Sequence, residues 1–231
     1  MSELHEMKVI AHIRTDFATK FGVPRQSGLA AELCGTIVFV PKYRNATALR
    51  GLDGFDYLWL IWGFSANIRE GAGWSPTVRP PLLGGNTAMG VFATRSPFRP
   101  NNLGLSSVKI VAIEESAADG VVIHVQGADL MNNTPIYDIK PYVAYSDAHP
   151  QARSGFVDEN RWQCLVVNIP QEYECLFTLQ DFKALRQLLS LDPRPQYQDN
   201  PERVYGMPFA GYDVRFTVQG TELNVVEVVL L

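Results

Sequence analysis

Three short segments of the chain carry side chains that could hold a small polar ligand, and the first is Pro24-Arg25-Gln26. Pro24 fixes the local backbone and has no backbone N–H to donate. Arg25 offers a fork of donors that suits a carboxylate or phosphate, and Gln26 can both donate and accept. The segment predicts a contact with a polar ligand, and an ordinary exposed loop is the alternative.

The second segment spans residues 93–102, where Arg95 and Arg99 lie four residues apart with Phe98 between them. Prolines at positions 97 and 100 disfavour a helix, so the side chains are displayed from a rigid turn. An aromatic ring between two guanidinium groups can stack on a nucleobase while the arginines meet anionic groups. A proline-rich turn with solvated arginines is the alternative.

The third segment begins at Asp129 and continues through Leu130 and Met131 to Asn132. The Asp129 carboxylate can accept hydrogen bonds from a ribose diol or contact an ammonium group. Asn132 is followed by a second asparagine, and this pair predicts a turn.

Asp138 and Lys140 follow on an expected strand, where alternation places both side chains on one face. An exposed ion pair would contribute little stability and needs no function. The apolar neighbours Ile136 and Ile139 favour a position at a cleft instead.

The elements that must position these segments are mostly short strands. Apolar or alternating runs predict strands at residues 7–13, 35–40, 57–64, 88–94, 105–113 and 121–127, with a short helical turn at 45–51. So many strands with little helical periodicity favour a barrel or a sandwich. Residues 71–86 form a long glycine- and proline-rich segment, and such a length is typical of a functional loop.

The last third of the chain has a different pattern. Thr178, with Asp181 three residues later, predicts a helix N-terminus, and the helical pattern ends before Pro193. Residues 213–218 and 223–230 predict a hairpin with Gly220 in its loop. We therefore predict a mainly β protein with some α: a single-sheet, barrel-type domain over residues 1–146 and a smaller α+β domain over residues 147–231.

Several common signatures are absent. The chain has no GxGxxG, no P-loop, no G-x-S-x-G elbow and no HExxH, and its strands do not alternate with helices as in a Rossmann fold. Loops between strands must therefore hold any nucleotide-like cofactor. The three cysteines form no close pair and the four histidines are scattered, so we expect no metal and a cytoplasmic protein. No stretch approaches the ~20 apolar residues that cross a bilayer, so we expect no membrane span.

The charge pattern bears on a nucleic-acid partner. The net charge of −4 argues weakly against one. Residues 71–113, however, contain no Asp or Glu, and Arg79, Arg95, Arg99 and Lys109 all fall among them. A local positive surface on an acidic protein can attract phosphate. A chance lack of acids in these loops and strands is the alternative.

The chain resembles the TrmO/TsaA-like family of tRNA adenine-N6-methyltransferases at motifs spread over nearly its whole length. The matching stretches are Pro24-Arg25-Gln26, Arg50-Gly51-Leu52 with Phe55 and Leu58-Trp59, residues 74–81, Leu83-Gly84-Gly85-Asn86, residues 89–101, residues 138–142, Asp192-Pro193-Arg194-Pro195 with Tyr205, and Asp213-Val214-Arg215. In combination these motifs are highly specific.

The resemblance implies a barrel-type methyltransferase that forms a homodimer with S-adenosylmethionine near the subunit interface. It implies methyl transfer to N6 of adenosine 37 in the tRNA anticodon loop, where a threonylcarbamoyl group is already attached (t6A to m6t6A). By position, the implied cofactor contacts are Pro24, Arg25, Gln26, Ser65, Ala66, Arg95, Leu105, Asp129, Leu130, Met131 and Asn132. Family members often carry His-Gln in place of residues 65 and 66 and an acid in place of residue 132, so backbone contacts are expected there.

The resemblance also suggests roles in catalysis. We expect Asp138 to accept the N–H proton of the adenine amine, with Lys140 and Tyr142 placing the modified base. Either Lys140 or Arg99 would pair with the threonyl carboxylate. Expected tRNA contacts are Arg79, Phe98, Arg99, Arg194 and Arg215. A barrel-type purine- or nucleotide-binding module and a methyltransferase with a non-tRNA acceptor are the alternatives. A purely structural protein is disfavoured by the several polar, proline-fixed loops.

Overall fold

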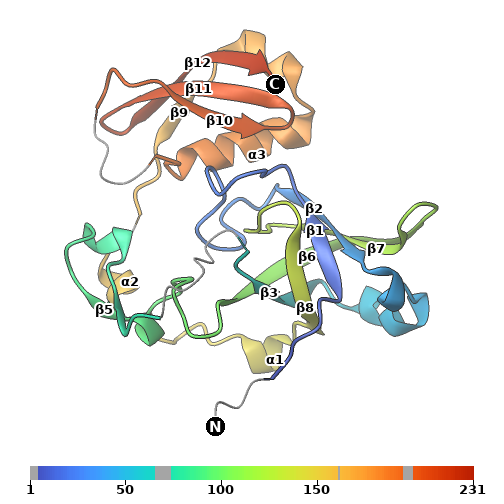
Figure 1. Cartoon of the computed structure of the whole chain (residues 1–231). Helices are drawn as coiled ribbons and strands as arrows, with labels where there is room; N and C mark the ends of the chain where they lie inside the picture. Colours follow the sequence, from blue (N-terminus) through green and yellow to red (C-terminus); the bar gives the residue numbers. More distant parts are fainter. Residues whose placement is uncertain (1–4, 66–73, 161, 195–199) are drawn as a thin grey trace.

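The computed structural model describes residues 5–65, 74–160, 162–194 and 200–231. The chain is mainly β with few helices, as the sequence predicts. Figure 1 shows two units, with a sheet and its helix lying against one end of a larger β unit.

The larger unit is a single antiparallel sheet. Its strands are β1 (Ala11–Arg14), β2 (Cys34–Phe39), β3 (Tyr57–Gly63), β6 (Leu103–Ser116), β7 (Gly120–Gln126) and β8 (Thr134–Pro141). They follow the order β1-β2-β7-β6-β3-β8, and β8 pairs again with β1, so the sheet closes into a barrel. Closure leaves the barrel without an unpaired edge.

Alternation along the strands fills the barrel interior. On β3, Leu58, Leu60 and Trp62 are buried, and they meet Ile123 from β7 and Ile136 from β8. The side chains between them point outward, as a period of two residues requires. The short helical turn predicted at residues 45–51 is present as the 3-10 helix η2 (Ala46–Leu49), between η1 (Pro41–Tyr43) and η3 (Leu52–Gly54).

Three long connections leave the barrel at the same end. Because every pairing in the sheet is antiparallel, successive barrel strands run in opposite directions. The connections β1–β2 (residues 15–33), β3–β6 (residues 64–102) and β7–β8 (residues 127–133) therefore meet at one end. Each of them carries one of the three segments singled out in the sequence.

The β3–β6 connection contains a small hairpin of its own. Its elements are β4 (Thr77–Val78), η4 (Pro81–Leu83), β5 (Met89–Gly90) and η5 (Val91–Ala93), and β4 pairs with β5. The strand predicted at residues 88–94 is therefore wrong beyond its first residues. The Arg99 guanidinium donates to the carbonyls of Val91 at 3.1 Å and Thr94 at 2.7 Å, and these bonds hold the chain in a 3-10 turn.

The smaller unit is a four-stranded sheet with one long helix. After α1 (Ala144–Asp147) and α2 (Phe156–Glu159) come β9 (Val166–Asn168), η6 (Gln171–Leu176), α3 (Leu179–Ser190), β10 (Tyr205–Phe209), β11 (Tyr212–Gln219) and β12 (Glu222–Leu230). The sheet order is β10-β11-β12-β9, with β9 parallel to β12. Thr178 caps α3 by accepting from the Asp181 amide, and Gly220 turns the β11–β12 hairpin at φ 58°, as predicted.

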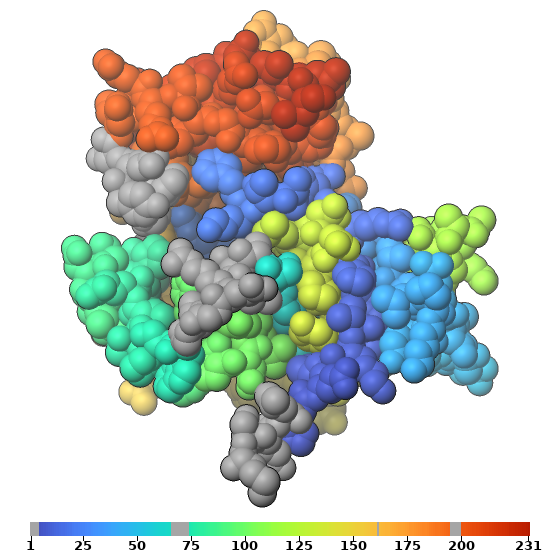
Figure 2. All heavy atoms as spheres, in the orientation of Figure 1, coloured from blue at the N-terminus to red at the C-terminus, as the bar shows by residue number. Residues whose placement is uncertain are grey.

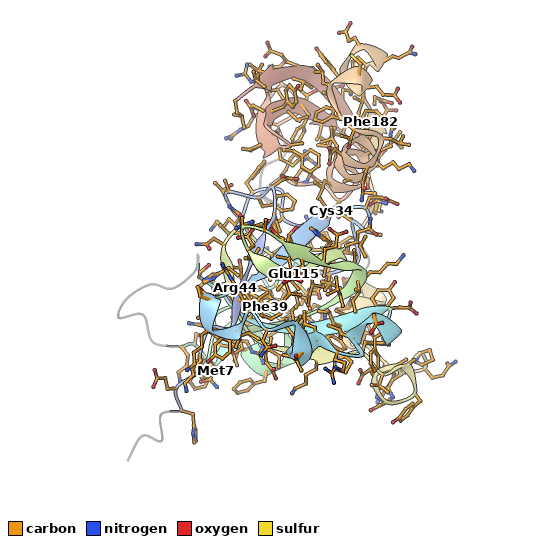
Figure 3. All side chains as sticks on the ribbon, turned by 90° about the vertical axis from the view of Figure 1, so that its right-hand side faces the viewer. Met7, Cys34, Phe39, Arg44, Glu115 and Phe182 are labelled. Atoms are coloured by element: carbon orange, nitrogen blue, oxygen red, sulfur yellow. The ribbon has the colours of Figure 1, made fainter. Side chains whose placement is uncertain are left out.

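The 15–33 connection belongs to the core of the smaller unit. Phe17, Ala30 and Leu33 are buried together with α3 and the sheet, and Figure 2 shows this connection filling the space between the two units. Gly22, at φ 84°, lies so close to Met207 that an added Cβ would come within 2.7 Å of its sulfur. In Figure 3, Cys34 at the start of β2 lies on the side of the barrel that faces the unit carrying Phe182.

Candidate functional site

The three connections and the start of strand β6 bring a set of polar side chains together, which we call the rim cluster: Gln26, Ser27, Arg95, Ser106 and Asp129. The Arg95 guanidinium donates to the Gln26 side-chain oxygen. Ser106 donates to Asp129 Oδ1 at 2.6 Å. Arg95 and the Ser27 backbone amide both act electrostatically on the Asp129 carboxylate. Residues from distant segments of the chain thus face one another at the end of the barrel where the three connections meet.

Burial dominates the electrostatics of the rim cluster. Desolvation raises the pKa of Asp129, because a charged carboxylate loses water contacts there. The Ser106 hydroxyl, the backbone amides and Arg95 oppose this shift by stabilising the charged form. A partly buried carboxylate with a nearby arginine is a site where a ligand carrying both donors and acceptors can be held.

Two neighbours in the barrel interior fix the position of Asp129. The Trp62 indole donates to Ser106 Oγ at 2.9 Å, and Ser106 is fully buried, so its hydroxyl proton is directed at Asp129. Gly104 lies against the Trp62 ring, where any added Cβ would collide. Ser106 and Trp62 were missed by sequence reasoning, although a serine pair inside an apolar strand is a signal that could have shown them.

A second group of expected site residues lies on the outer wall of the barrel. Leu105 on β6 and Asp138 on β8 both pair with Ile61 of the intervening β3, so the three side chains share the outer face. Leu105 is 58% exposed. The structure therefore places Leu105 and Asp138 on one wall, and Asp129 inside the end of the barrel.

The outer wall continues with an ion pair and an aromatic group. Lys140 Nζ lies 2.9 Å from Asp138 Oδ2, and both side chains are exposed. The Asp138 side chain also accepts from the Ile139 backbone amide at 3.0 Å. Tyr142 packs against Tyr57 and Trp59, with ring centroids 6.2 and 5.7 Å away. The pair lies on an open wall in this chain, so a cleft there requires a further surface.

Pro24 and Arg25 directly precede Gln26, but the Arg25 side chain binds the end of helix α3 and not the rim cluster. Arg25 donates to the carbonyls of Leu191 at 2.6 Å and Asp192 at 2.9 Å, which end helix α3. Its guanidinium also lies 3.8 Å from the centre of the Trp162 ring. The fork that we expected to meet a ligand thus satisfies helix-terminal carbonyls.

A pocket of about 670 Å³ opens at the junction of the two units. Its lining includes Lys20, Pro24 and Arg25 from the first connection, Arg79 from the second, and Arg194 from the loop after α3. Arg79 is exposed, whereas Arg194 is held by a bidentate ion pair with Asp192 at 2.8 and 2.9 Å. The pocket has an excess of positive charge.

The other expected tRNA contacts differ in exposure and in the bonds that their side chains already make. Phe98 is 51% exposed. Arg99 is folded back onto its own loop through its bonds to Val91 and Thr94. Arg215 is paired with Asp213 and Glu227 on the C-terminal sheet. Their roles as tRNA contacts stay predictions, and the structure shows that two of these arginines already have acceptors.

The remaining expected cofactor contacts differ in position. Leu130 is buried in the barrel, Met131 is half-buried, and Asn132 uses its side-chain oxygen to accept from the Thr15 amide at 3.2 Å. Ser65 follows β3 at the same barrel end and is exposed, and Ala66 lies outside the described residues. Among the residues that the structure describes, no three histidine, cysteine or acidic side chains are grouped to hold a metal ion.

The geometry defines a class: a mainly β protein with a barrel whose end brings a carboxylate and an arginine together. Comparison with known proteins gives the family. The model of the tRNA-methyltransferase O N-terminal domain matches residues 12–148, and the model of the TrmO C-terminal domain matches residues 165–230. The chain therefore belongs to the TrmO family.

Relatives and solved structures agree with this assignment. The chain is 37% identical over 221 residues to the tRNA (adenine(37)-N6)-methyltransferase of Escherichia coli, covering 92% of this chain and 93% of that protein. It is 42% identical to the enzyme of the same name from Eikenella corrodens, over 71% of this chain and 92% of the relative. The crystal structure of TrmO from Pseudomonas aeruginosa superposes with a TM-score of 0.77 at 29% identity, covering 98% of each chain.

Proposed function

We propose that this protein transfers a methyl group from S-adenosylmethionine to N6 of adenosine 37 of tRNA, where the base already carries a threonylcarbamoyl group. The observation that carries the proposal is the rim cluster, in which Gln26, Arg95 and Asp129 meet at one end of the barrel. Family membership supplies the reaction class. The site supplies residues with suitable chemistry.

The rim cluster fits the polar groups of S-adenosylmethionine. A partly buried carboxylate can accept from the ribose hydroxyls or the ammonium group, and Asp129 is held for that role by Ser106. Arg95 can meet the carboxylate of the methionyl part, and Gln26 keeps the Arg95 guanidinium in place. When bound, the cofactor supplies an electrophilic methyl group on a sulfonium ion.

The outer wall offers groups that suit the adenosine. The exocyclic nitrogen of adenine is a poor nucleophile because its lone pair is shared with the ring, so alignment and a proton acceptor are the main aids. Asp138 is the acceptor we propose, and Lys140, 2.9 Å away, is placed to pair with the threonyl carboxylate. Tyr142 packs against Trp59, the residue of β3 that pairs with Lys140. Leu105 lies two strands from Asp138 on the same face, which brings the cofactor and base regions close.

We further propose that the active form is a homodimer. The outer wall exposes apolar side chains, with Leu105 at 58%, Val111 at 53% and Tyr57 at 43%. A second copy against this wall would cover that surface and turn the open Asp138–Lys140 pair into a cleft. Sedimentation equilibrium measures the mass directly. A monomer at working concentration with full activity would remove the dimer from the proposal.

We propose a functional division near residue 146, with the 15–33 connection anchoring the smaller unit to the barrel. A tRNA substrate favours the cytoplasm. Within the described part of the chain, no helix is long and apolar enough to span a membrane.

The test is methyl transfer followed at nucleoside level. Purified protein is incubated with labelled S-adenosylmethionine and tRNA, and the anticodon-loop nucleosides are analysed by mass spectrometry. We expect m6t6A from t6A-containing tRNA and little product from tRNA that lacks the threonylcarbamoyl group. Cofactor binding without transfer would favour a binding module, and transfer that survives RNase treatment of the acceptor would favour a different substrate.

A further inference from the structure

The β3–β6 connection exposes large aromatic rings that the rim cluster and the outer wall do not use. Phe92 is 69% exposed and Trp74 is 53% exposed. Exposed apolar side chains that gather into one patch mark interaction sites, whereas singly scattered ones are ordinary. These two residues lie on either side of the small β4–β5 hairpin, because Trp74 precedes β4 and Phe92 follows β5.

The two rings form a pair, which we call the aromatic platform: Trp74 and Phe92. Their centroids lie 6.1 Å apart with planes inclined by 30°. This tilted arrangement leaves ring surface uncovered, because both residues are more than half exposed.

Contacts of the neighbouring backbone and of Arg99 hold the Phe92 side of the platform in place. Val91, next to Phe92, is buried and donates its amide to the Pro76 carbonyl at 2.9 Å. Arg99 binds the carbonyls on both sides of the 3-10 turn that carries Phe92, and its guanidinium lies 5.5 Å from the Phe92 ring centre. Arg99 is therefore a positioning residue for Phe92, and the pair is presented at low entropic cost.

The charge of the surrounding segment favours a negatively charged partner. Residues 71–113 contain no Asp or Glu, so the platform sits in a segment whose only ionised side chains are cations. Arg95 and Arg79 on the same connection are exposed. Flat rings with neighbouring cations match unpaired nucleotides, whose bases stack while their phosphates carry negative charge.

We propose that Trp74 and Phe92 form a stacking platform for an unpaired base of the tRNA anticodon loop other than the methylated adenosine. This inference rests on the proposed function, because it takes tRNA as the substrate. It adds a recognition surface on the hairpin, separate from the rim cluster that faces the cofactor. The platform selects a splayed, single-stranded loop and contributes affinity without contacting the reacting atoms.

The test measures RNA binding, not turnover. Full-length wild-type protein, Trp74→Ala and Phe92→Ala are titrated with a fluorescent anticodon stem-loop. We expect each variant to lose about tenfold or more in RNA affinity, whereas Trp74→Phe and Phe92→Tyr, which keep a ring, stay within about threefold. Affinity for S-adenosylmethionine, measured by calorimetry, should not change. The matched control is Leu179→Ala, which removes a 70% exposed apolar side chain from the other unit.

Abasic stem-loops locate the contacted base. With one base removed at a time, the loss caused by Trp74→Ala should vanish at one loop position, since the stacking partner is already gone. RNA affinities that match wild type would overturn the platform, as would a fall in dimer mass for the alanine variants, which would make it a contact between copies. If wild type transfers no methyl group to tRNA, the proposed function fails. If it does and the variants bind RNA normally, only the platform fails.

Discussion

Asp129 is a site residue whose acid–base chemistry is altered by its surroundings. Burial raises its pKa, so the carboxylate is protonated at a higher pH than an ordinary aspartate, which titrates near pH ~3.9. We expect the affinity for S-adenosylmethionine to fall as the pH drops through this raised pKa, because the protonated acid no longer attracts an ammonium group. Calorimetric titration over a pH series measures this, and Asp129→Asn should weaken binding about tenfold or more and remove this pH dependence.

The raised pKa of Asp129 also affects stability, and stability changes with pH in the opposite direction to cofactor affinity. A carboxyl whose folded pKa is raised holds its proton more tightly in the folded state, so the free energy of unfolding decreases as pH rises from the unfolded pKa through the folded one. Asp129→Asn should therefore flatten this part of the stability curve, measured by urea unfolding at several pH values. An unchanged slope would show that Asp129 is not desolvated.

Asp138 should act on turnover and leave cofactor binding intact. Its ion pair with Lys140 is exposed, and such pairs contribute little to stability. We expect Asp138→Asn to lower kcat about 100-fold, in the range of general base catalysis, with unchanged melting and unchanged cofactor affinity. Lys140→Met should raise KM for t6A-containing tRNA instead. Normal turnover by folded Asp138→Asn would remove this residue from the mechanism.

Strand β6 links the barrel core to the rim cluster, and a substitution at Gly104 can test this link. An added Cβ would collide with the Trp62 ring, which donates to Ser106 beside Asp129. We expect Gly104→Ala to cost about 1–3 kcal/mol of unfolding free energy and to weaken cofactor binding as well. Gly54→Ala is the matched control, because nothing lies within 4 Å of a Cβ there. Equal melting temperatures for the two variants would refute the prediction.

Elements that depend on their own residues could be predicted from the sequence. Elements whose conformation depends on contacts with residues outside the segment could not. Thr178 and Gly220 mark a helix start and a hairpin through their own side chain or backbone, and both predictions are confirmed. The strand at residues 88–94 is wrong because Arg99 binds that backbone from outside the segment. On β6, residues 109, 111 and 113 alternate with residues 108, 110 and 112, and the two sets are too alike for the sequence to predict which face is buried.

The candidate site could likewise be predicted only in part from the sequence. Each of its three segments has a recognisable composition, so Gln26, Arg95 and Asp129 could be selected one at a time. Their meeting depends on strand direction and on closure of the barrel, which are non-local properties. The Arg25 fork has the right chemistry for a ligand, but the end of α3, more than 160 residues later, occupies it.

At the scale of the whole molecule, Arg25 joins the two units. It comes from a connection of the barrel and binds carbonyls at the end of α3, and it stacks on Trp162. Burial lowers its pKa, and the charge of Asp192 opposes that shift. A partly buried guanidinium that satisfies helix-terminal carbonyls should matter for stability, because its removal leaves those acceptors without a donor.

We therefore expect Arg25→Met to reduce the unfolding free energy by about 2–3 kcal/mol, measured by urea denaturation, because hydrogen bonds to charged groups contribute on that scale. Arg79→Met is the matched control, since Arg79 lines the same pocket but is exposed. That variant should keep its stability and instead bind tRNA more weakly, with a shallower salt dependence, as expected on loss of a phosphate contact. If Arg25→Met is as stable as wild type and binds S-adenosylmethionine poorly, Arg25 contacts the cofactor and is not needed to join the two units.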